Sequence, residues 1–545
     1  MATFYIDPIN GNDSNNGTSW ATAWQTITNG ATAPRIGPGD FIKIAKSPGF
    51  ASIGNATWTD GSKTVTLASA QTQTVELCET AWTASANVTA TASTTRKEGS
   101  YSSQLAIAAG FTTGKVAYKT LSSTLDLSSY QKLSFWFRNS AAIAAGNVLR
   151  VCLCSDNSGD TIVDSFYILA IPSVDRWLPL TLTRSGGGNL GSSINSVAVY
   201  ADVDPGTVTI FLDDIIACTT DGLNLQSLIS KNSSEQGGNE SWFGIQSING
   251  TTVLLDNETN TLANAGRGYS GASETVTTYK RETFKTALVA SSSVEVNVVN
   301  DSGTPTSYIE YSGGWNTSTD TQDGETFFDA INGLGWGFVS HAKTCFSVDH
   351  ISLVRSYHGF YFYGGSTVGS TLSAKFKSKI FCSNCSYQGF VLSGDSAHIS
   401  LDEAIFSCNN GQYGMYTLAV SCLIPSGSEF NNNLVGGILF ASAARQTFKS
   451  VETRNNGSHG IRLNSAYDIL LLNSTIYETT EVSAQEGTNS QISSQNHDNT
   501  PGSHVIFAYG GTIRNDASVR RTGSDFSWRM DVTSTDRVSS WPLEF

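Results

Sequence analysis

The chain has 545 residues, of which 14% are charged, and a formal net charge of −14. A chain of this length predicts about two to four domains with a large buried core. The acidic balance argues against a nucleic-acid-binding protein, because such proteins neutralise phosphates with clustered lysine and arginine side chains. The sequence holds no continuous apolar run of about 18 residues, so no membrane span is predicted.

Residues 1–74 are predicted to form an N-terminal cap and the first coils of a stacked β structure. A strand at 4–6 is followed by a stretch at 19–27 that is compatible with a short helix, and a second strand is expected at 41–44. A helix over the first coil would cover the strand edges and the apolar core at the end of such a stack. The first residues lack a basic region followed by an apolar stretch, so no signal peptide is predicted and synthesis in a reducing cytoplasm is expected.

Residues 75–220 are predicted to form an inserted antiparallel β-sandwich, because polar and apolar residues alternate with period two between turns. The clearest strands are expected at 132–138, 148–154, 196–200 and 208–213. Cys78 and Cys218 bracket the segment. This placement predicts a domain that leaves the stacked structure and returns to it at nearby points.

The rest of the chain is predicted to resume and then end the stacked structure. Residues 221–334 are expected to form coils with hairpin excursions, one of which turns at Asn249-Gly250. Regular coils are expected over 335–478. The polar stretch 479–503 is predicted to be a loop, and 479–545 as a whole a linker with a C-terminal β cap.

Glycines recur at nearly constant spacing in the second half of the chain. They are separated by 30, 25, 23 and 23 residues, and each opens a short apolar run; they are Gly359, Gly389, Gly414, Gly437 and Gly460. A repeat of this length, with apolar runs broken by Asn, Gly and Ser, predicts a β-solenoid in which each repeat is one rung. An ordinary all-β domain with turns at similar spacing is the alternative.

An asparagine lies five positions before each of the last four of these glycines. The four residues are Asn384, Asn409, Asn432 and Asn455. Identical amides stacked on successive rungs can hydrogen-bond to one another along the axis of a solenoid. We therefore predict that these four side chains form a structural ladder.

The first 45 or so residues carry a recurrent cap motif. It consists of Phe4-Tyr5-Ile6-Asp7-Pro8, Asn10-Gly11-Asn12-Asp13, Gly17, Ser19-Trp20, Trp24, Thr26-Ile27 and Pro38-Gly39-Asp40. This motif resembles the N-terminal cap of right-handed parallel β-helix proteins of the pectate-lyase-like family, which includes many bacteriophage tailspikes. The run 99–105, the strand 135–137, Arg176-Trp177 and the run 211–214 resemble jelly-roll carbohydrate-binding modules. The fold implied is all-β: a right-handed parallel β-helix with an inserted antiparallel β-sandwich.

The resemblance implies a bacteriophage virion surface protein, such as a tailspike, tail fibre or head appendage, that contacts host cell-surface polysaccharide. It also implies contacts with other virion proteins and a homotrimer. A polysaccharide lyase or glycoside hydrolase acting along the β-helix flank is one alternative, and a purely structural or decorating solenoid is another. The family holds lyases, hydrolases and structural members alike, so the fold does not decide between these functions. The lack of a strong catalytic motif favours binding or structure over catalysis.

Two glutamates give the best catalytic candidate. Glu429 and Glu452 both lie eight residues before a rung glycine, and Arg454 follows two residues later. Equivalent positions on neighbouring rungs are about 4.8 Å apart, close to the separation of the two carboxylates in a retaining glycosidase. Rung flanks are solvated and carry acidic residues in any case, so a surface stack without catalytic function is the alternative.

Metal sites are weakly indicated. Asp320, Asp323 and Glu325 form an oxygen-rich loop of a kind that can hold Ca²⁺, although the spacing is not that of an EF-hand and a solvated turn is the alternative. The only Cys-x-x-Cys, at 382–385, has no second pair to complete a zinc site. No cofactor is predicted. His350, beside Asp349, is a further acid–base candidate, with simple exposure as the alternative.

Three tyrosines precede rung glycines and are predicted to contact a ligand. Tyr357, Tyr387 and Tyr413 lie near the turn before each glycine, where side chains are exposed more often than in the strand that follows. Exposed aromatic faces stack against sugar rings, so a row of them would form a track for a glycan. A role in the core is the alternative, because alternation along a strand sends half of its side chains inward.

Overall fold

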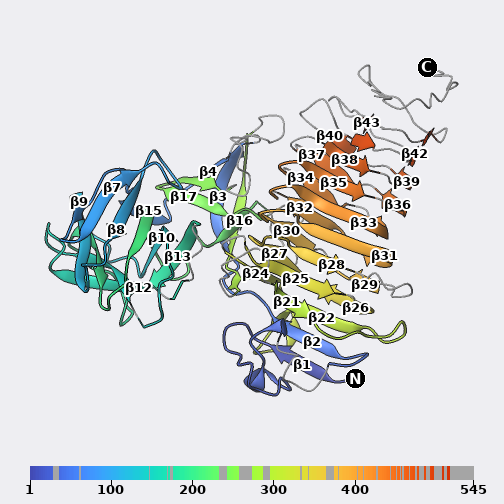
Figure 1. The fold of residues 1–545 in the computed structure, drawn as a ribbon, viewed down its shortest axis with the longest axis horizontal. Helices are drawn as coiled ribbons and strands as arrows, with labels where there is room; N and C mark the ends of the chain where they lie inside the picture. Colours follow the sequence, from blue (N-terminus) through green and yellow to red (C-terminus); the bar gives the residue numbers. More distant parts are fainter. Residues whose placement is uncertain are drawn as a thin grey trace.

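The structure is a computed structural model. It describes residues 1–28, 36–59, 63–146, 148–168, 170–171, 176–231, 242–256, 273–286, 295–331, 334–341, 343–363, 373–378 and 380–401, and shorter stretches between 403 and 515. A stack of strands forms a solenoid along one side of the molecule, and an antiparallel sandwich lies beside it (Figure 1). No helix in the part of the chain just given is long and apolar enough to cross a membrane.

The solenoid has three flat faces, because each coil contributes strands to three stacks. The first face comprises β21 (Glu295–Val299), β25 (Trp336–His341), β28 (Phe360–Tyr363), the first parts of β31 (Phe390–Leu401) and β33 (Tyr413–Ile424), β35 (Gly436–Ala441), β38 (His459–Asn464), β41 (Ala484–Glu486) and β43 (Ile506–Phe507). The second face comprises β1 (Thr3–Ile6), β2 (Phe41–Ala45), β22 (Ile309–Asn316), β26 (Phe346–Asp349), β29 (Ser373–Phe376), the last parts of β31 and β33, β36 (Ala444–Lys449), β39 (Tyr467–Leu472), β42 (Gln491–Gln495) and β44 (Thr512–Asn515).

The third face is a separate parallel sheet. It comprises β20 (Phe284–Lys285), β24 (Thr326–Asp329), β27 (Ile351–Val354), β30 (Ile380–Ser383), β32 (Ile405–Cys408), β34 (Glu429–Asn431), β37 (Glu452–Arg454) and β40 (Thr475–Tyr477). Each strand pairs in parallel with the equivalent strand of the next coil. Parallel pairing in three stacks is the β-solenoid that the glycine repeat predicts.

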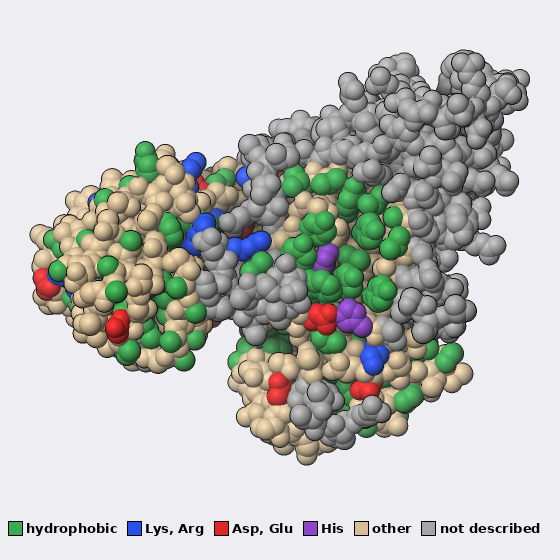
Figure 2. Space-filling model, viewed as in Figure 1, with side chains coloured by type: hydrophobic (Ala, Val, Ile, Leu, Met, Phe, Trp, Pro, Cys, Tyr) green, Lys and Arg blue, Asp and Glu red, His purple; other side chains and the backbone are tan. Residues whose placement is uncertain are grey.

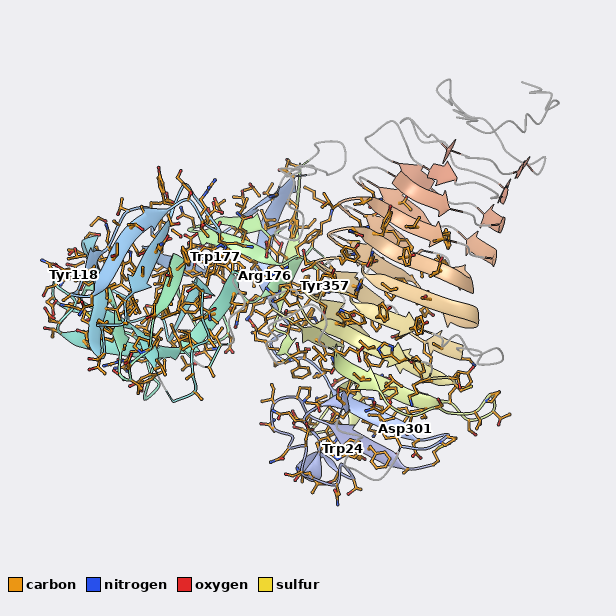
Figure 3. All side chains as sticks on the ribbon, viewed as in Figure 1. Trp24, Tyr118, Arg176, Trp177, Asp301 and Tyr357 are labelled. Atoms are coloured by element: carbon orange, nitrogen blue, oxygen red, sulfur yellow. The ribbon has the colours of Figure 1, made fainter. Side chains whose placement is uncertain are left out.

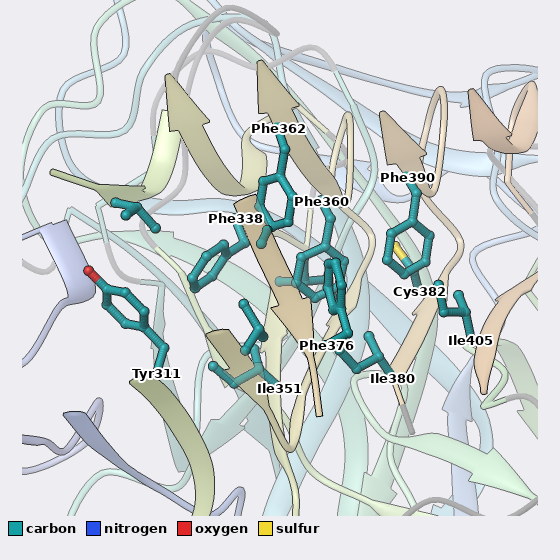
Figure 4. Close-up of a cluster of buried hydrophobic side chains, with 14 of the residues drawn as sticks. Tyr311, Phe338, Ile351, Phe360, Phe362, Phe376, Ile380, Cys382, Phe390 and Ile405 are labelled. Atoms are coloured by element: carbon teal, nitrogen blue, oxygen red, sulfur yellow. The ribbon is translucent and has the colours of Figure 1, made fainter. Parts of the chain in front are cut away.

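Rows of large apolar side chains fill the solenoid. One row of register partners on the first face points inward: Phe338, Phe360, Phe390, Met415, Ile438 and Ile461. Figure 4 shows the first three of them in the core. The rings of Phe360 and Phe390 are parallel, with centroids 5.0 Å apart. Burial of each such side chain stabilises the fold by about 1.5–3 kcal/mol. The core is therefore continuous from rung to rung.

The rung glycines are explained by close approach. A Cβ at Gly359 would lie 1.9 Å from the Cys382 sulfur, and one at Gly389 would lie 2.0 Å from the Ser407 hydroxyl. A Cβ at Gly414 would lie 2.8 Å from the Gly437 carbonyl oxygen of the next rung. No other residue fits where the turn after the third face packs this closely. The repeat of glycines is therefore a repeat of this contact.

The N-terminal cap differs from our prediction of a helix at 19–27. That stretch begins with a single 3₁₀ turn, Trp20–Thr22, and does not continue as a helix beyond it. Trp24 is buried instead, stacks on Phe4 at a centroid distance of 5.0 Å, and donates its indole N–H to the Asn15 carbonyl oxygen. Trp24, together with the partly buried Trp20 that packs against the same core, closes this end of the stack.

The inserted segment is an antiparallel sandwich of two sheets. One contains β5 (Thr72–Glu76), β7 (Val88–Ser93), β8 (Ser102–Ile107), β10 (Lys132–Asn139), β13 (Leu178–Thr183) and β15 (Val208–Cys218). The other contains β6 (Thr83–Ala84), β9 (Gly114–Leu125), β11 (Leu149–Cys154), β12 (Ile162–Ile168) and β14 (Ile194–Ala201). Their inner faces share one apolar core.

A third, antiparallel sheet lies between the sandwich and the solenoid (Figure 1). It contains β3 (Ala51–Thr59), β4 (Thr64–Leu67), β16 (Leu228–Ser230), β17 (Ile245–Asn249), β18 (Thr252–Leu255) and β19 (Ser273–Arg281). The hairpin at Asn249-Gly250 is present, with Gly250 at φ 60°. The hairpin excursion of β17 and β18 agrees with our prediction, but β3 and β4, predicted as part of the first coils, pair in antiparallel fashion with β19 and β18 across the insertion. The loop predicted at 479–503 also differs, since β41 and β42 extend two faces there.

Candidate functional site

A buried amide ladder holds the turn between the third and first faces. Asn433 accepts hydrogen bonds at its Oδ1 from the backbone N and the Nδ2 of Asn410, at 3.1 and 2.9 Å. Asn456 accepts two more from Asn433, at 2.9 and 3.0 Å. In the preceding rung Cys385 takes the same place, and its backbone N donates to Asn410 Oδ1 at 3.0 Å.

The ladder lies one residue later than we predicted. Asn384 donates to the neighbouring Ser383 hydroxyl at 3.4 Å and is not part of it. Asn409, Asn432 and Asn455 lie outside the described residues. Two asparagines stand side by side at each of the three later turns, so the sequence alone does not show which of the two forms the ladder. At the first turn the ladder position is Cys385, so only the preceding position carries asparagine at all four turns.

Tyr357 and Tyr387 stack on neighbouring turns just above the ladder. Their rings are nearly parallel, at 4°, with centroids 5.3 Å apart, and both side chains are half-buried. The backbone N of Tyr387 donates to the Tyr357 carbonyl oxygen, and the backbone N of Gln412 on the next turn donates to the Tyr387 carbonyl oxygen. Tyr413 was predicted to join them, but Gln412 occupies the matching position on the next turn. Tyr413 follows Gln412 and is only 6% exposed.

Three further rings adjoin this pair and were not predicted. Trp336 contacts Tyr361 at a centroid distance of 4.3 Å and His358 at 5.2 Å. His358 also lies edge-on to Tyr357 at 4.8 Å and to Tyr387 at 5.4 Å. We call these five residues, Trp336, Tyr357, His358, Tyr361 and Tyr387, the aromatic turn.

His358 is neutral at ordinary pH. Burial lowers its pKa to about 4, although a hydrogen bond to the Gln388 side chain acts in the opposite direction. Its Nδ1 and the indole Nε1 of Trp336 are buried with no hydrogen-bond partner among the described residues. Orphaned buried polar atoms are uncommon in folded proteins, and an ordered water or ion is one way in which such atoms are satisfied.

An apolar row continues from the aromatic turn along the outside of the first face. Tyr361, Val391, Tyr416 and Leu439 are register partners on four successive strands. Apolar side chains gather on the solenoid surface, with one histidine within the patch and a second one beside an acidic residue at its lower edge (Figure 2). The surface therefore offers ring faces and aliphatic groups over several rungs.

The sandwich is tied to the solenoid next to the aromatic turn. Arg355, buried two residues before Tyr357, pairs with Asp329 and donates to the Gln226 carbonyl oxygen at 2.9 Å. Gln226 in turn donates to the Pro179 carbonyl oxygen of the sandwich at 2.6 Å. Arg176, two residues before β13, donates to the Ser386 hydroxyl at 3.3 Å.

The predicted catalytic glutamates occupy matching positions. Parallel pairing of β34 with β37 sets Glu429 opposite Glu452 and Asn431 opposite Arg454. Glu429 is half-buried and accepts a hydrogen bond from Asn431 Nδ2 at 3.0 Å. The side chains of Glu452 and Arg454 are not among the described ones. Stacking of the two backbone positions agrees with the prediction, and a catalytic role stays a prediction.

The three carboxylates predicted near a calcium ion have separate partners. Asp320 pairs with Lys43 at 2.7 Å, and Asp323 pairs with Lys46 at 2.8 Å. Glu325 is fully buried, where burial raises its pKa to about 7, and it accepts from the Ser352 hydroxyl at 3.0 Å. A calcium ion would have to displace two lysines, and calcium binding stays a prediction. Among the described residues no group of three or more His, Cys, Asp and Glu side chains is arranged to hold a metal.

His350 and Asp349 do form a pair. Their Nδ1 and Oδ1 atoms are 2.7 Å apart, and Gln322 Nε2 lies 3.0 Å from the other carboxylate oxygen. Burial alone would lower the pKa of His350, but the hydrogen bond to Asp349 and the charge of Glu325 raise it above its ordinary value. The pair lies at the end of β26, where the second face stops, and Tyr357 of the aromatic turn follows seven residues after His350.

The comparisons with known proteins bear on the fold. A family described as "right handed beta helix region" matches residues 357–520. Together with the parallel pairing of the described strands, this match confirms the predicted fold class, a right-handed parallel β-helix in an all-β chain. No curated protein matches the chain.

Several solved structures are similar at low identity. They include a point mutant of the family 29 carbohydrate-binding module CBM29-2 (12% identity, 31% of this chain and 91% of that one, TM-score 0.16). The periplasmic alginate epimerase AlgG is another (15%, 44% and 58%, TM-score 0.21). A third is the catalytic unit of a GH87 α-1,3-glucanase from Streptomyces thermodiastaticus strain HF3-3 (9%, 85% and 86%, TM-score 0.25). Likenesses this weak carry no argument about the activity of this chain.

Proposed function

We propose that this chain is a glycan-contacting surface protein of a bacteriophage virion, and that the aromatic turn is its binding site. The observation that carries the glycan part is the parallel stack of Tyr357 on Tyr387, with the Trp336–Tyr361 contact beside it. Half-buried tyrosine and tryptophan rings combine an apolar face with a polar edge. A sugar ring offers the matching combination of an aliphatic face and hydroxyl edges.

The spacing of the rings suits a polymer. Successive turns of the solenoid are about 4.8 Å apart, and the Tyr357 and Tyr387 centroids are 5.3 Å apart. A glycan chain lying parallel to the solenoid axis would meet a ring on each of the two rungs that carry Tyr357 and Tyr387. Tyr416 and Leu439 lie in the apolar row further along the same face and would extend the track.

The placement on a virion rests on the N-terminal motif. Its residues form the closed cap at the start of the stack, where Phe4 and Trp24 cover the first apolar layer. We propose that the chain is made in the host cytoplasm, assembles as a homotrimer and attaches to other virion proteins. Size-exclusion chromatography with light scattering tests the trimer: a mass of one or two chains would refute it.

A polysaccharide depolymerase is the second candidate, because the register places Glu429 opposite Glu452 on adjacent rungs. In a retaining mechanism one carboxylate attacks the sugar while the other donates a proton to the leaving oxygen. Removal of one carboxyl group, as in Glu429→Gln, would then abolish cleavage and leave binding at the aromatic turn intact.

A glycan microarray tests the proposed function. The wild-type chain, a Tyr357→Ala/Tyr387→Ala double variant and a Tyr118→Ala control on the sandwich are compared, and bound glycans are checked for shortening. Binding that the double variant loses and the control keeps supports the proposal; shortening of the bound glycan adds the depolymerase. If no glycan binds, the chain is a structural solenoid and the proposal is wrong.

A further inference from the structure

The sandwich meets the solenoid at the same turns that carry the stacked tyrosines. Arg355 links the solenoid to the sandwich through Gln226 and Pro179, and it is followed at once by Ser356 and Tyr357. On the next rung Ser386 contacts the sandwich and precedes Tyr387. Tyr387 is therefore next to a direct contact with the sandwich, and Tyr357 is two residues from a contact that Gln226 relays to it.

The contact is held in a fixed geometry. Arg355 is 4% exposed and Asp329 fully buried, and the carboxylate also accepts from the Thr283 hydroxyl at 2.7 Å. On the sandwich side Trp177 is buried and packs edge-on against Phe211 at a centroid distance of 6.2 Å. The Arg355–Asp329 pair on the solenoid and the buried Trp177 on the sandwich thus hold the segment that begins at Arg176.

We propose that the sandwich supplies Arg176 to the glycan site, and that the glycan carries an anionic substituent which this residue recognises. This inference rests on the proposed function of the aromatic turn. Arg176 is exposed, lies at the seam on the side of Tyr357, and reaches the turn that carries Tyr387 (Figure 3). A guanidinium group presents five N–H donors in a planar fork that matches a carboxylate, sulfate or phosphate.

The chemistry of the neighbouring residues favours this assignment. The aromatic turn itself holds one titratable imidazole, and the lowered pKa of His358 keeps that ring uncharged. Arg176, which donates to Ser386 on the turn that carries Tyr387, is an exposed cation next to the stacked pair. Sugar rings would lie on Tyr357 and Tyr387 while an acidic group on one of them meets the guanidinium. The insertion then acts as a specificity element for the solenoid.

Affinity electrophoresis of the full chain tests the assignment. The gels contain dextran or pullulan as neutral polymers, and dextran sulfate, alginate or polygalacturonate as anionic ones. We expect the anionic polymers to retard the wild type more strongly, and Arg176→Gln to weaken that retardation about tenfold, as loss of one charge-assisted hydrogen-bonded pair implies. About 0.5 M salt should reduce the wild type to the level of the variant.

Two variants separate ligand binding from a merely structural contact. Ser386→Ala removes the hydrogen-bond acceptor but keeps the charge of Arg176, and should bind as the wild type does. Arg96→Gln removes an exposed charge elsewhere on the sandwich and should also bind normally. Equal retardation by neutral and anionic polymers, or a Ser386→Ala variant as weak as Arg176→Gln, would overturn the role of Arg176. If no polymer retards the wild type, the proposed function itself fails.

Discussion

Replacement of Asn433 by alanine should destabilise the solenoid strongly. The side chain is fully buried and makes four hydrogen bonds: two accepted from Asn410, one donated to the Ser407 carbonyl oxygen and one donated to Asn456. The Nδ2 of Asn410 and the Oδ1 of Asn456 each keep a second partner. Two backbone groups, Asn410 N–H and the Ser407 carbonyl, lose the side-chain bond without that compensation.

The magnitude follows from these two groups. A buried donor or acceptor left unsatisfied costs about 1–3 kcal/mol, so Asn433→Ala should lower the free energy of unfolding by about 2–6 kcal/mol. In a domain of a few hundred residues each kcal/mol moves the melting temperature by about 2–4 °C. A downward shift of roughly 10 °C is therefore expected in the solenoid transition.

Differential scanning calorimetry at one fixed scan rate is the assay, because a chain of this size is expected to unfold irreversibly. Thr317→Ala, which shortens an exposed side chain on a solenoid loop, is the control and should shift the transition by no more than about 0.5 kcal/mol. Asn433→Asp should lower the melting temperature more at neutral pH, where the buried carboxylate is charged, than at about pH 4, where the protonated carboxyl group can donate a hydrogen bond. An Asn433→Ala variant that melts with the control would refute the ladder as a source of stability.

Three further variants test the buried charges. The pKa of His358 is lowered from 6.5 to about 4, so the free energy of unfolding decreases by about 3 kcal/mol as the pH falls through this range. In thermal melts across the same range, His358→Gln should remove this loss of stability. Burial raises the pKa of Asp214, in β15, to about 8, so the stability of the fold falls as the pH rises from about 4 to 8. Asp214→Asn should therefore raise the melting temperature at pH 8 and have little effect at pH 4. Equal effects at both pH values would contradict the raised pKa. Asp329→Asn leaves the buried Arg355 without its ion-pair partner and should cost about 3–5 kcal/mol, measured by chemical denaturation; a loss under about 1 kcal/mol would show that the seam is not anchored there.

The rungs could be predicted because their cause is local. Gly359, Gly389 and Gly414 are each required where the turn packs within contact distance of a side chain or carbonyl on the neighbouring rung, and the apolar run after each of them fills the next core layer. Such a cause repeats with every coil, so it leaves a period in the sequence. The amide ladder also repeats, but the doubled asparagines at 409–410, 432–433 and 455–456 hid its register.

Other features depend on contacts between distant segments and left no period. Ser386 and Arg176 are 210 residues apart in sequence, and nothing in either neighbourhood indicates the other. The middle sheet forms because β4 and β18 meet across the whole insertion. Trp336 could have been found, since Gly337 aligns with Gly359 at the start of the repeat and its Cβ would approach the Gly359 carbonyl oxygen to 2.8 Å.

The central claim is that the aromatic turn binds a glycan, and isothermal titration calorimetry with the best glycan from the microarray tests it most directly. Each stacked ring should contribute about 1 kcal/mol, so Tyr357→Ala should weaken binding about fivefold, with unchanged affinity for Tyr118→Ala on the outer sheet of the sandwich. The opposite pattern, in which Tyr118→Ala loses the glycan and Tyr357→Ala keeps it, would move the binding site from the solenoid to the sandwich and contradict the account.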